Sequence, residues 1–349
     1  GINHAPPAAF LDRLGALFEF TPPRQPGHTV IDAIAAMARG DSKALICMGG
    51  NFAVAAPDPA TTFAALRKLD LSVHVATKLN RSHLLVGKQT FILPCLGRSE
   101  VDQQAGGAQR VSVEDSMCFV RSSAGPRPPA STHLRSECAI VAGLAKASLG
   151  QRNTVDWDHL IADYDRIRDA IEAVLPEVFI DYNQRLRQDG SFHLRNPASE
   201  RQWNTASGKA ELACFHGLGE EDDVAGDILS LTSIRSHEQF NTTIYALDDR
   251  YRGVFGRRDV LFMAAADMRE RKFHAGERVL VSAVTATNAA PRSIELTVVE
   301  RDLPSGSAAM YYPESNVLIG LDRFDAPSKV PAFKRVPVRV CALATMTPE

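Results

Sequence analysis

Several features that mark other classes of protein are absent from this sequence of 349 residues. No apolar run approaches the roughly 20 residues of a membrane-spanning helix, and no basic N-terminal segment leads into an apolar one, as in a signal peptide. The 39 lysines and arginines nearly balance the 41 aspartates and glutamates, so the charge gives no basic footprint for nucleic acid. We therefore expect a globular protein of the cytoplasm, with no membrane segment and no nucleic-acid partner.

Cysteine is sparse and scattered along the chain. The six residues are Cys47, Cys95, Cys118, Cys138, Cys214 and Cys341. No two have the CxxC spacing of iron–sulfur clusters and zinc sites, so buried structural thiols in a reducing compartment are the expected state. His237 has no second histidine at close spacing. The sequence therefore predicts no metal ligands.

The motifs of common enzyme classes are missing as well. The sequence contains no P-loop, no GxSxG elbow and no evident pair of catalytic carboxylates. No GxGxxG is followed by an acidic residue about 20 positions later, which disfavours an NAD-binding dehydrogenase. No catalytic residue is therefore predicted in this chain.

Helical and strand patterns alternate in the first part of the chain. Apolar residues recur at helical spacing over 30–39, and a second helix is predicted over 59–69. Short apolar runs at 43–48, 71–76 and 91–94 are followed by glycine-rich or polar loops. Strands that alternate with helices predict a parallel sheet with right-handed crossovers, and so an α/β fold.

The rest of the sequence contains further helical patterns and then a series of predicted β-strands. Helices are predicted over residues 10–20, 136–149 and 157–175. Short β-branched segments at 228–234, 260–263, 278–284, 294–299 and 336–341 then predict an all-β unit, most simply a barrel. Residues 217–226 are acidic and glycine-rich. We place the boundary there, between an α/β domain with a helical connection (1–226) and a β-barrel domain (227–349).

Polar loops follow the three predicted strands of the sheet. Gly49–Gly50–Asn51 ends the first strand, TKLNRSH (77–83) follows the second and Arg98 with Glu100 follows the third. Ligands of open parallel sheets bind at the carboxyl ends of the strands, where glycine allows close approach to a phosphate. Each loop also has a structural alternative: a plain turn, a solvated loop or an Arg–Glu salt bridge.

Two further clusters lie on the predicted barrel. The segment 235–243 and the following 248–252 are dense in donors and acceptors, which favours a ligand or a partner that satisfies them. Aromatic residues at 311–312, with Asn316 and Lys334, are suited to cover a planar ring, or else they pack at a barrel mouth.

In this order, the segments resemble the C-terminal half of the molybdopterin oxidoreductases of the dimethyl-sulfoxide reductase type, and among them the formate-dehydrogenase-like alpha subunits. The resemblance covers nearly the whole chain. It rests on five stretches: ALICMGGNFAVAAPD, VATKLNRSHLLVGKQTFILPCLGRSE, TASGKAEL, SIRSHEQFNTTIYALDDRYRG and YYPESNVLIGLDRFDAPSKVPAFK.

The resemblance implies a fold, a cofactor and a set of contacts. The fold is a parallel-sheet nucleotide-binding domain followed by a C-terminal double-psi β-barrel. The cofactor is bis-molybdopterin guanine dinucleotide with molybdenum or tungsten. By resemblance, the guanosine and phosphates of one dinucleotide are held by Gly50, Asn51, Thr77, Lys78, Asn80 and Arg98. From the barrel side, pterin and diphosphate are contacted by Arg235, Ser236, Gln239, Asn241 and Thr242, and the pterin contacts are completed by Asn316 and Lys334.

The chain also departs from the family pattern. TKLNRSH stands where the family has a TxTA segment, at Lys78 and Asn80. The metal-ligating residue of the family, and any iron–sulfur cluster, lie in an earlier part of the chain and outside these residues. The resemblance therefore implies the N-terminal remainder of the same enzyme as a partner and allows an electron-transfer subunit as another.

The predicted function is thus cofactor binding within a molybdenum-dependent oxidoreductase, in which the cofactor carries the chemistry. The 349 residues alone are expected to be inactive. The alternative is a stand-alone nucleotide-binding or assembly module without redox activity.

Overall fold

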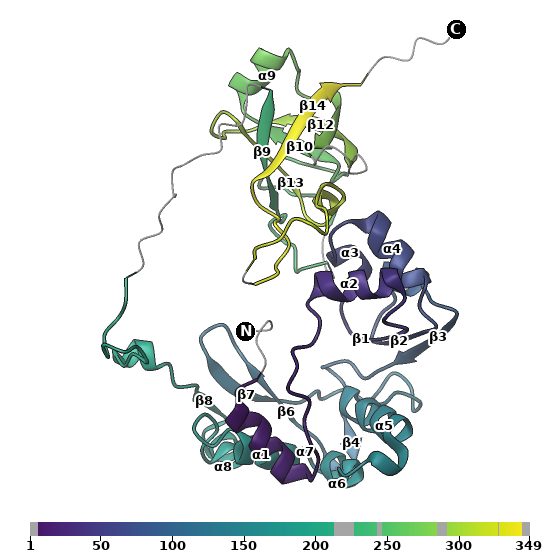
Figure 1. Ribbon diagram of the computed structural model, residues 1–349, viewed down its shortest axis with the longest axis vertical. Coiled ribbons are helices and arrows are strands. Elements are labelled where there is room, and N and C mark those ends of the chain that lie inside the picture. The colour runs from purple at the N-terminus through teal and green to yellow at the C-terminus, as the bar shows by residue number, and fades with distance from the viewer. Residues whose placement is uncertain (1–5, 213–226, 243–245, 285–291, 327, 344–349) are drawn as a thin grey trace.

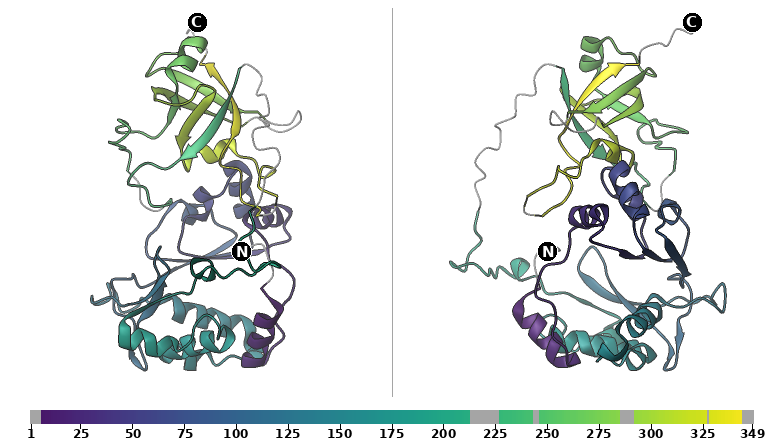
Figure 2. Two further views of the ribbon diagram at one scale, coloured as in Figure 1. Left: turned by 90° about the vertical axis from the view of Figure 1, so that its left-hand side faces the viewer. Right: turned by 45° about the vertical axis from the view of Figure 1, so that its right-hand side comes forward.

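The computed structural model describes residues 6–212, 227–242, 246–284, 292–326 and 328–343. Three parts follow one another along the long axis of the molecule (Figure 1, Figure 2). A closed barrel lies at one end, a small parallel sheet with its helices lies in the middle, and a mainly helical body lies at the other end.

The parallel sheet contains three strands in the order of the sequence. They are β1 (Ala44–Met48), β2 (Leu71–Ala76) and β3 (Gln89–Pro94), paired in parallel as β1-β2-β3. The prediction of parallel strands with polar loops at one edge is therefore confirmed. Because the strands run the same way, the loops after Met48, Ala76 and Pro94 leave the sheet at the same edge.

Local sequence sets the helices that pack on this sheet. They are α2 (Val30–Arg39), α3 (Phe52–Ala55) and α4 (Pro59–Arg67). The Thr29 side chain caps α2 by accepting a hydrogen bond from the Asp32 amide, and Asp58 caps α4 in the same way at Thr61. A 3-10 turn, η1 (Arg81–Leu84), connects β2 to β3.

The core of this middle part lies between the sheet and its helices. Ile34 and Met37 of α2 pack with Leu66 and Leu69, and Leu45 of β1 packs against the same cluster. Side chains alternate along a strand, so the other face of the sheet carries Ile46.

Within the part of the chain that the structure describes, the helical body contains five helices and two small sheets, with short 3-10 turns between them. The helix α1 packs on α7, which also contacts α6 and α8. The antiparallel sheet has the order β6-β7-β8, and β4 pairs with β5 in a short hairpin. The elements are α1 (Ala8–Phe18), β4 (Gln103–Gln104), β5 (Gly107–Ala108), β6 (Val111–Glu114), β7 (Phe119–Ser123), α5 (Glu137–Leu149), η2 (Gly150–Arg152), α6 (Trp157–Ala162), α7 (Tyr164–Val174), α8 (Tyr182–Asp189), β8 (Ser191–His193) and η3 (Pro197–Glu200).

One predicted helix, over residues 157–175, is in fact two. Asp163 has an extended backbone with φ −149° and ψ 117°, and its side chain caps α7 by accepting from the Asp165 amide. The Tyr164 amide donates to the side chain of Gln109, 2.8 Å away. A cap and a tertiary hydrogen bond therefore interrupt an apolar pattern that continues through the break.

The barrel is a closed sheet of six strands in the order β10-β12-β11-β14-β9-β13. Five of the strands were predicted, and β13 was missed. The elements of this part are β9 (Ile228–Ile234), β10 (Val260–Met263), α9 (Ala265–Arg271), β11 (Arg278–Ala283), β12 (Ser293–Glu300), β13 (Ser307–Tyr311), η4 (Glu314–Leu318) and β14 (Val336–Ala342).

Alternation fills the barrel. Along β9 every second residue is buried, and Leu229 and Leu231 are fully enclosed in a core with Leu261, Val279 and Leu296. Closure leaves this sheet no free edge.

Two sequence expectations concern the chain as a whole. Within the residues that the structure describes, none of the helices combines the length and the apolar character needed to cross a membrane. The segment 217–226, where the sequence places the domain boundary, lies outside the described residues, as does Cys214.

Candidate functional site

The turn after β1 presents backbone to open space. Gly49 and Gly50 have φ angles of 63° and 67°, in the left-handed region that favours glycine. A Cβ at either position would meet nothing within 4 Å. The Gly49 amide donates to the Val75 carbonyl at 2.7 Å, which fixes the turn to β2. The turn is therefore tied to β2, and a ligand can approach its backbone closely.

A hydrogen-bond network ties this turn to the loop after β2. The Asn80 amide nitrogen Nδ2 donates to the Gly50 carbonyl at 2.7 Å, while its Oδ1 accepts from the Ser82 amide at 2.9 Å. Ser82 Oγ donates to Asn51 Oδ1 at 3.0 Å and accepts from the Ala53 amide at 3.1 Å. Asn51 and Asn80 therefore shape the two loops, and Thr77 and Lys78 lie exposed beside them.

Two histidines lie beneath the same turn. The rings of His74 and His83 are 4.9 Å apart, and both Nε2 atoms are buried without a hydrogen-bond partner among the described residues. A cavity of about 10 Å³ lies there, lined in part by Cys47 and Gly50. Burial, and then the neighbouring His83, lower the pKa of His74 below its usual value. The middle part of the molecule therefore contains a neutral, buried histidine.

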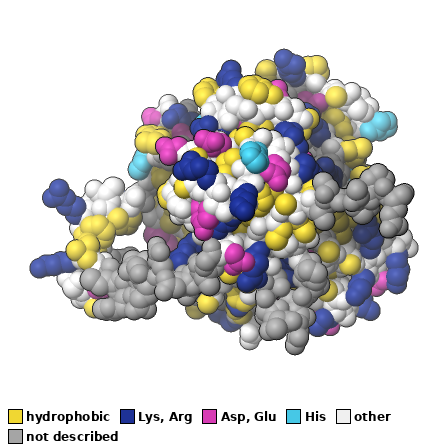
Figure 3. Space-filling view, turned by 90° about the horizontal axis from the view of Figure 1, so that it is seen from above, with side chains coloured by type: hydrophobic (Ala, Val, Ile, Leu, Met, Phe, Trp, Pro, Cys, Tyr) yellow, Lys and Arg dark blue, Asp and Glu magenta, His cyan; other side chains and the backbone are white. Residues whose placement is uncertain are grey.

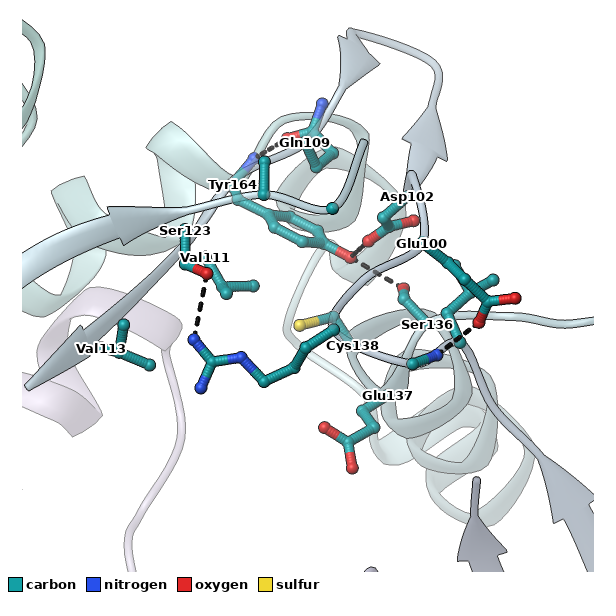
Figure 4. A pocket seen from close by; sticks show the side chains of 15 residues that line it. Glu100, Asp102, Gln109, Val111, Val113, Ser123, Ser136, Glu137, Cys138 and Tyr164 are labelled. Carbon is teal, nitrogen blue, oxygen red and sulfur yellow. Dashed lines mark hydrogen bonds between the residues drawn. The ribbon is translucent and has the colours of Figure 1, made fainter. Parts of the chain in front are cut away.

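Arg98, after β3, faces a separate cavity of about 270 Å³ (Figure 4). Its guanidinium donates to Ser123 Oγ at 3.0 Å. Glu100 accepts instead from the backbone amides of Gly97 and Ala130, both at 2.6 Å, and these hydrogen bonds lower its pKa. The structure thus shows Arg98 and Glu100 bonded to different partners, rather than the salt bridge that the sequence left open.

A polar cluster forms the opposite wall of that cavity (Figure 4). The Tyr164 hydroxyl donates to Asp102 and lies 2.8 Å from Ser136 Oγ. Burial, and then the hydrogen bond to Asp102, raise the pKa of Tyr164, and burial also raises that of the Cys138 thiol. A protonated phenol and a protonated thiol make this cluster a brace between α5 and α7 rather than a source of nucleophiles.

The loop after β9 is organised by a buried arginine. Arg258 donates to Ser236 Oγ and to Gln239 Oε1, both at 3.0 Å, and it pairs with Glu314 at 2.9 Å. Gln239 in turn donates to the Tyr312 carbonyl at 2.7 Å. Ser236 and Gln239 are therefore held in place by the barrel before any ligand arrives.

A second polar network lies under the same loop. Asp249 is buried and accepts hydrogen bonds from Arg252, Tyr311 and His237. Burial acts to raise its pKa, but these hydrogen bonds outweigh burial and hold the pKa below the usual value. Asp249 is therefore a carboxylate that anchors the loop from below.

An open cavity of about 380 Å³ lies beside this loop. Its lining comprises two cations, two aromatic rings, a serine and an isoleucine: Ser233, Ile234, Arg235, Tyr312, Phe333 and Lys334. Arg235 is exposed and donates to Asn241 Oδ1 at 2.7 Å, and Lys334 donates to the Ser233 carbonyl. This cavity joins cations to aromatic faces, as an anionic group carrying a planar ring requires.

The barrel and the middle part meet at α3. Asn316 is fully buried, and its Nδ2 donates to the carbonyls of Val54, Ala55 and Ala56 at 2.9, 3.1 and 3.2 Å. The Tyr312 hydroxyl also donates to the Ala55 carbonyl, at 3.3 Å. These carbonyls lie at the C-terminal end of α3, where the last carbonyl groups of a helix have no hydrogen-bond partner within the helix. One helical turn thus joins the strand-end loop at Gly50 to the barrel.

An ion pair supports the same contact. Arg292 and Asp58 form a bond of 2.7 Å with both side chains largely buried. The Asp58 amide donates to the carbonyls of Asn316 and Ile319. The barrel is therefore held against the middle part by backbone and charged contacts together.

The predicted binding residues fall into three groups. Gly50, Asn51, Thr77, Lys78 and Asn80 form the first, beside α3; Arg98 lies alone in its own cavity; Arg235, Ser236, Gln239, Asn241, Thr242 and Lys334 form the group on the barrel. Asn316 presents no surface to a ligand and caps α3 instead. Whether any of the other twelve contacts a cofactor stays a prediction.

Sequence reasoning missed Ser82 and Arg258. Ser82 stands in the motif TKLNRSH but links the two loops through its hydroxyl, which no spacing reveals. Arg258 follows another arginine and precedes an aspartate, a pattern typical of a solvated surface. A charged residue two positions before a fully apolar strand is the only available signal.

Viewed from the barrel end, basic and acidic side chains are interspersed over the surface (Figure 3). Within the described residues, no group of three or more histidine, cysteine, aspartate or glutamate side chains could hold a metal ion. On the face seen here, charges of both signs are thus mixed rather than gathered into one patch of a single sign.

A comparison with known protein families matches most of the barrel to a binding domain. Residues 229–337 match the molydopterin dinucleotide binding domain. "Protein YdeP" of Escherichia coli K12 is 51% identical over 343 residues, which is 97% of this chain and 45% of that protein. "Uncharacterized oxidoreductase Rv2900c" of Mycobacterium tuberculosis is 45% identical over 345 residues, 97% of this chain and 44% of that protein.

Among solved structures, acetylene hydratase from Pelobacter acetylenicus superimposes with a TM-score of 0.61. At 13% sequence identity, the match covers 96% of this chain and 50% of that one, and it shows a shared fold. The chain thus spans about half the length of the curated relatives and of this structural relative.

Proposed function

Starting from the fact that this chain belongs to the molybdopterin oxidoreductases, of which it forms a C-terminal part, we propose that it holds a bis-molybdopterin guanine dinucleotide for a formate-dehydrogenase-like enzyme. The division into an α/β domain up to residue 226 and a double-psi β-barrel from residue 227 is part of this proposal, as is a place in the cytoplasm. Molybdenum or tungsten is the metal.

The observation that carries the proposal is the open cavity on the barrel, beside the loop after β9. Arg235 and Lys334 line it together with the rings of Tyr312 and Phe333. Tyr312 also touches α3, whose other end is the open glycine turn at Gly50. Two cations, aromatic faces and free backbone fit a diphosphate joined to ring systems.

The protein's role in this proposal is to bind and orient. Arg235 and Lys334 would hold the diphosphate, while Ser236, Gln239, Asn241 and Thr242 would complete the barrel side. At the strand ends, the guanosine and phosphates of one dinucleotide would be held by Gly50, Asn51, Thr77, Lys78, Asn80 and Arg98. When bound, the metal centre supplies the two-electron redox chemistry. Asn316 is left out of this contact set, because it is buried at the junction.

The test measures binding of GDP, a fragment of the cofactor, to the whole chain by calorimetry. Arg235→Ala should raise the Kd about tenfold, because one charge-assisted pair to phosphate is lost. Arg235 is exposed, so the free energy of unfolding should change by less than about 0.5 kcal/mol. Wild-type chain should also melt at higher temperature with GDP present.

Arg339→Ala is the matched control, an exposed arginine on β14 that pairs with Asp227. It should leave GDP affinity unchanged. If Arg235→Ala unfolds the chain while binding per folded molecule persists, Arg235 is structural. No thermal shift at saturating nucleotide would contradict a preformed site.

The runner-up is a stand-alone binding or assembly module without redox activity. The gene product expressed from its own start codon, under molybdate-replete growth, separates the two. Molybdenum or tungsten that co-purifies supports the oxidoreductase, and a metal-free product supports the module.

A further inference from the structure

The parallel sheet of the middle part has two unlike faces. On one face, Leu45 packs into the core formed with α2 and α4. The register pairs Ile46 with Val73 and Val73 with Phe91, so these three residues share the opposite face. We call this the outer face and define it as Ile46, Met48, Val73, Val75 and Phe91.

The outer face is apolar and largely open to solvent at its sides. Ile46 is 56% exposed, Met48 46% and Phe91 55%, while Val73 and Val75 of the central strand are buried between them. Parallel sheets are otherwise found with helices on both faces, because each face is apolar. In the described part of this chain, α2 and α4 pack on one face only.

The amount of chain outside the structure indicates what covers this face. The curated relatives and the structural relative are about twice as long as the matched region, which includes the sheet. In those proteins, a polypeptide of similar size accompanies the region that this chain represents. Such a polypeptide is large enough to supply the missing helical layer.

We propose that the outer face is the docking surface for an amphipathic helical layer from the part of the enzyme that this chain does not span. This rests on the proposed function, since it takes the chain to be part of a larger oxidoreductase. Ile46, Met48 and Phe91 are the anchors of the contact, and the occupant presents apolar side chains to them. The strand ends at Gly50 and Asn80 then lie at the rim of that contact, beside the cofactor loops.

Hydroxyl-radical footprinting tests the contact on the wild-type protein. The gene product expressed from its own start and stop codons is compared with the 349-residue chain, both prepared without molybdate. Met48 and Phe91 should be modified at least about fivefold more slowly in the gene product, because the centre of an interface is fully desolvated. Met117, 70% exposed in the turn between β6 and β7, is the reference methionine.

Three results would overturn the proposal. Equal reactivity of Met48 and Phe91 in the two proteins is one such result, and a gene product no longer than this chain is another. Protection that appears in the 349-residue chain alone and grows with its concentration would assign the face to a second copy instead. Because the footprint needs no cofactor, protection without GDP binding would sink only the proposed function, and GDP binding without protection only the docking surface.

Discussion

The barrel and the parallel sheet differ in how they bury their apolar side chains and pair their edge strands. In the barrel, all six strands have two neighbours, and Leu229, Leu231 and Leu296 are fully enclosed. In the parallel sheet, β1 and β3 are edges, and Ile46 and Phe91 are more than half exposed. A sheet that closes on itself completes its own core, whereas an open parallel sheet depends on layers supplied from elsewhere.

This difference indicates that the two regions have unequal stability in the chain as described. The barrel core is formed from residues 229–338, all within one stretch of sequence. The outer face of the sheet leaves apolar area in water that contributes nothing to its stability. We therefore expect the middle part to open before the barrel does.

The largest effect should come from the barrel core. Leu296→Ala should lower the free energy of unfolding of the barrel by about 2–5 kcal/mol, through lost transfer free energy and the cavity left behind. Urea unfolding followed by hydrogen exchange should show the change in β12 and its neighbours. Leu69→Ala, equally buried under the sheet, is the control and should lower the protection of β2. If both variants lower protection everywhere alike, the two regions unfold as one unit and the comparison fails.

The junction between the regions should give a smaller effect. Asn316→Leu keeps the volume but removes the donor to three α3 carbonyls, so docking should weaken by about 1–3 kcal/mol. Exchange in α3 should accelerate while β9 and β14 stay protected. Ser328→Ala, on the exposed turn after Asp325, is a control that should change neither. Unaltered exchange in α3 would mean that the contact adds nothing to docking.

Mild acid should produce the smallest difference in stability between the parallel sheet and the barrel. The pKa of His74 is lowered in the folded state, so its stabilising effect is complete above the usual value near 6.5 and is lost as pH falls below it. The pKa of Asp249 is also lowered, but a carboxylate loses its contribution only below about 4. Between pH 8 and 5.5, protection factors should therefore fall in β2 and hold in β9.

A matched pair of variants checks this assignment. His74→Leu should abolish the pH dependence in β2, whereas His274→Leu, 88% exposed on the barrel, should leave it intact. A pH dependence that survives in His74→Leu would assign it to another group.

Helices and strands could be predicted where the residues of the segment itself show the pattern of that element. Burial alternates strictly along 228–234, and this segment was predicted to the residue as β9. The strand β13 was missed because SAAMY is made largely of small residues with no alternation. The face that a strand leaves uncovered could not be predicted from ALICM either, because that segment is apolar on both sides.

The candidate site was predictable in its location more than in its contacts. Polar loops at parallel strand ends must share an edge, so Gly50 and Asn80 were correctly expected to lie together. Asn316 was assigned to a ligand, but the structure places it against backbone carbonyls from a region about 260 positions away. No local pattern encodes such a partner, and the same holds for Arg258.

The contact at α3 has a consequence for how this protein tolerates change. Asn316 recognises carbonyl oxygens, which all residue types share, and not the side chains of Phe52–Ala55. Substitutions along that turn that preserve the packing of the buried Ala53 and Val54 therefore leave these hydrogen bonds intact, provided that the main chain keeps its path. A proline or a one-residue deletion there would displace the carbonyls and weaken the docking of the barrel. Backbone geometry, rather than residue identity, is therefore what must be preserved for this contact to persist.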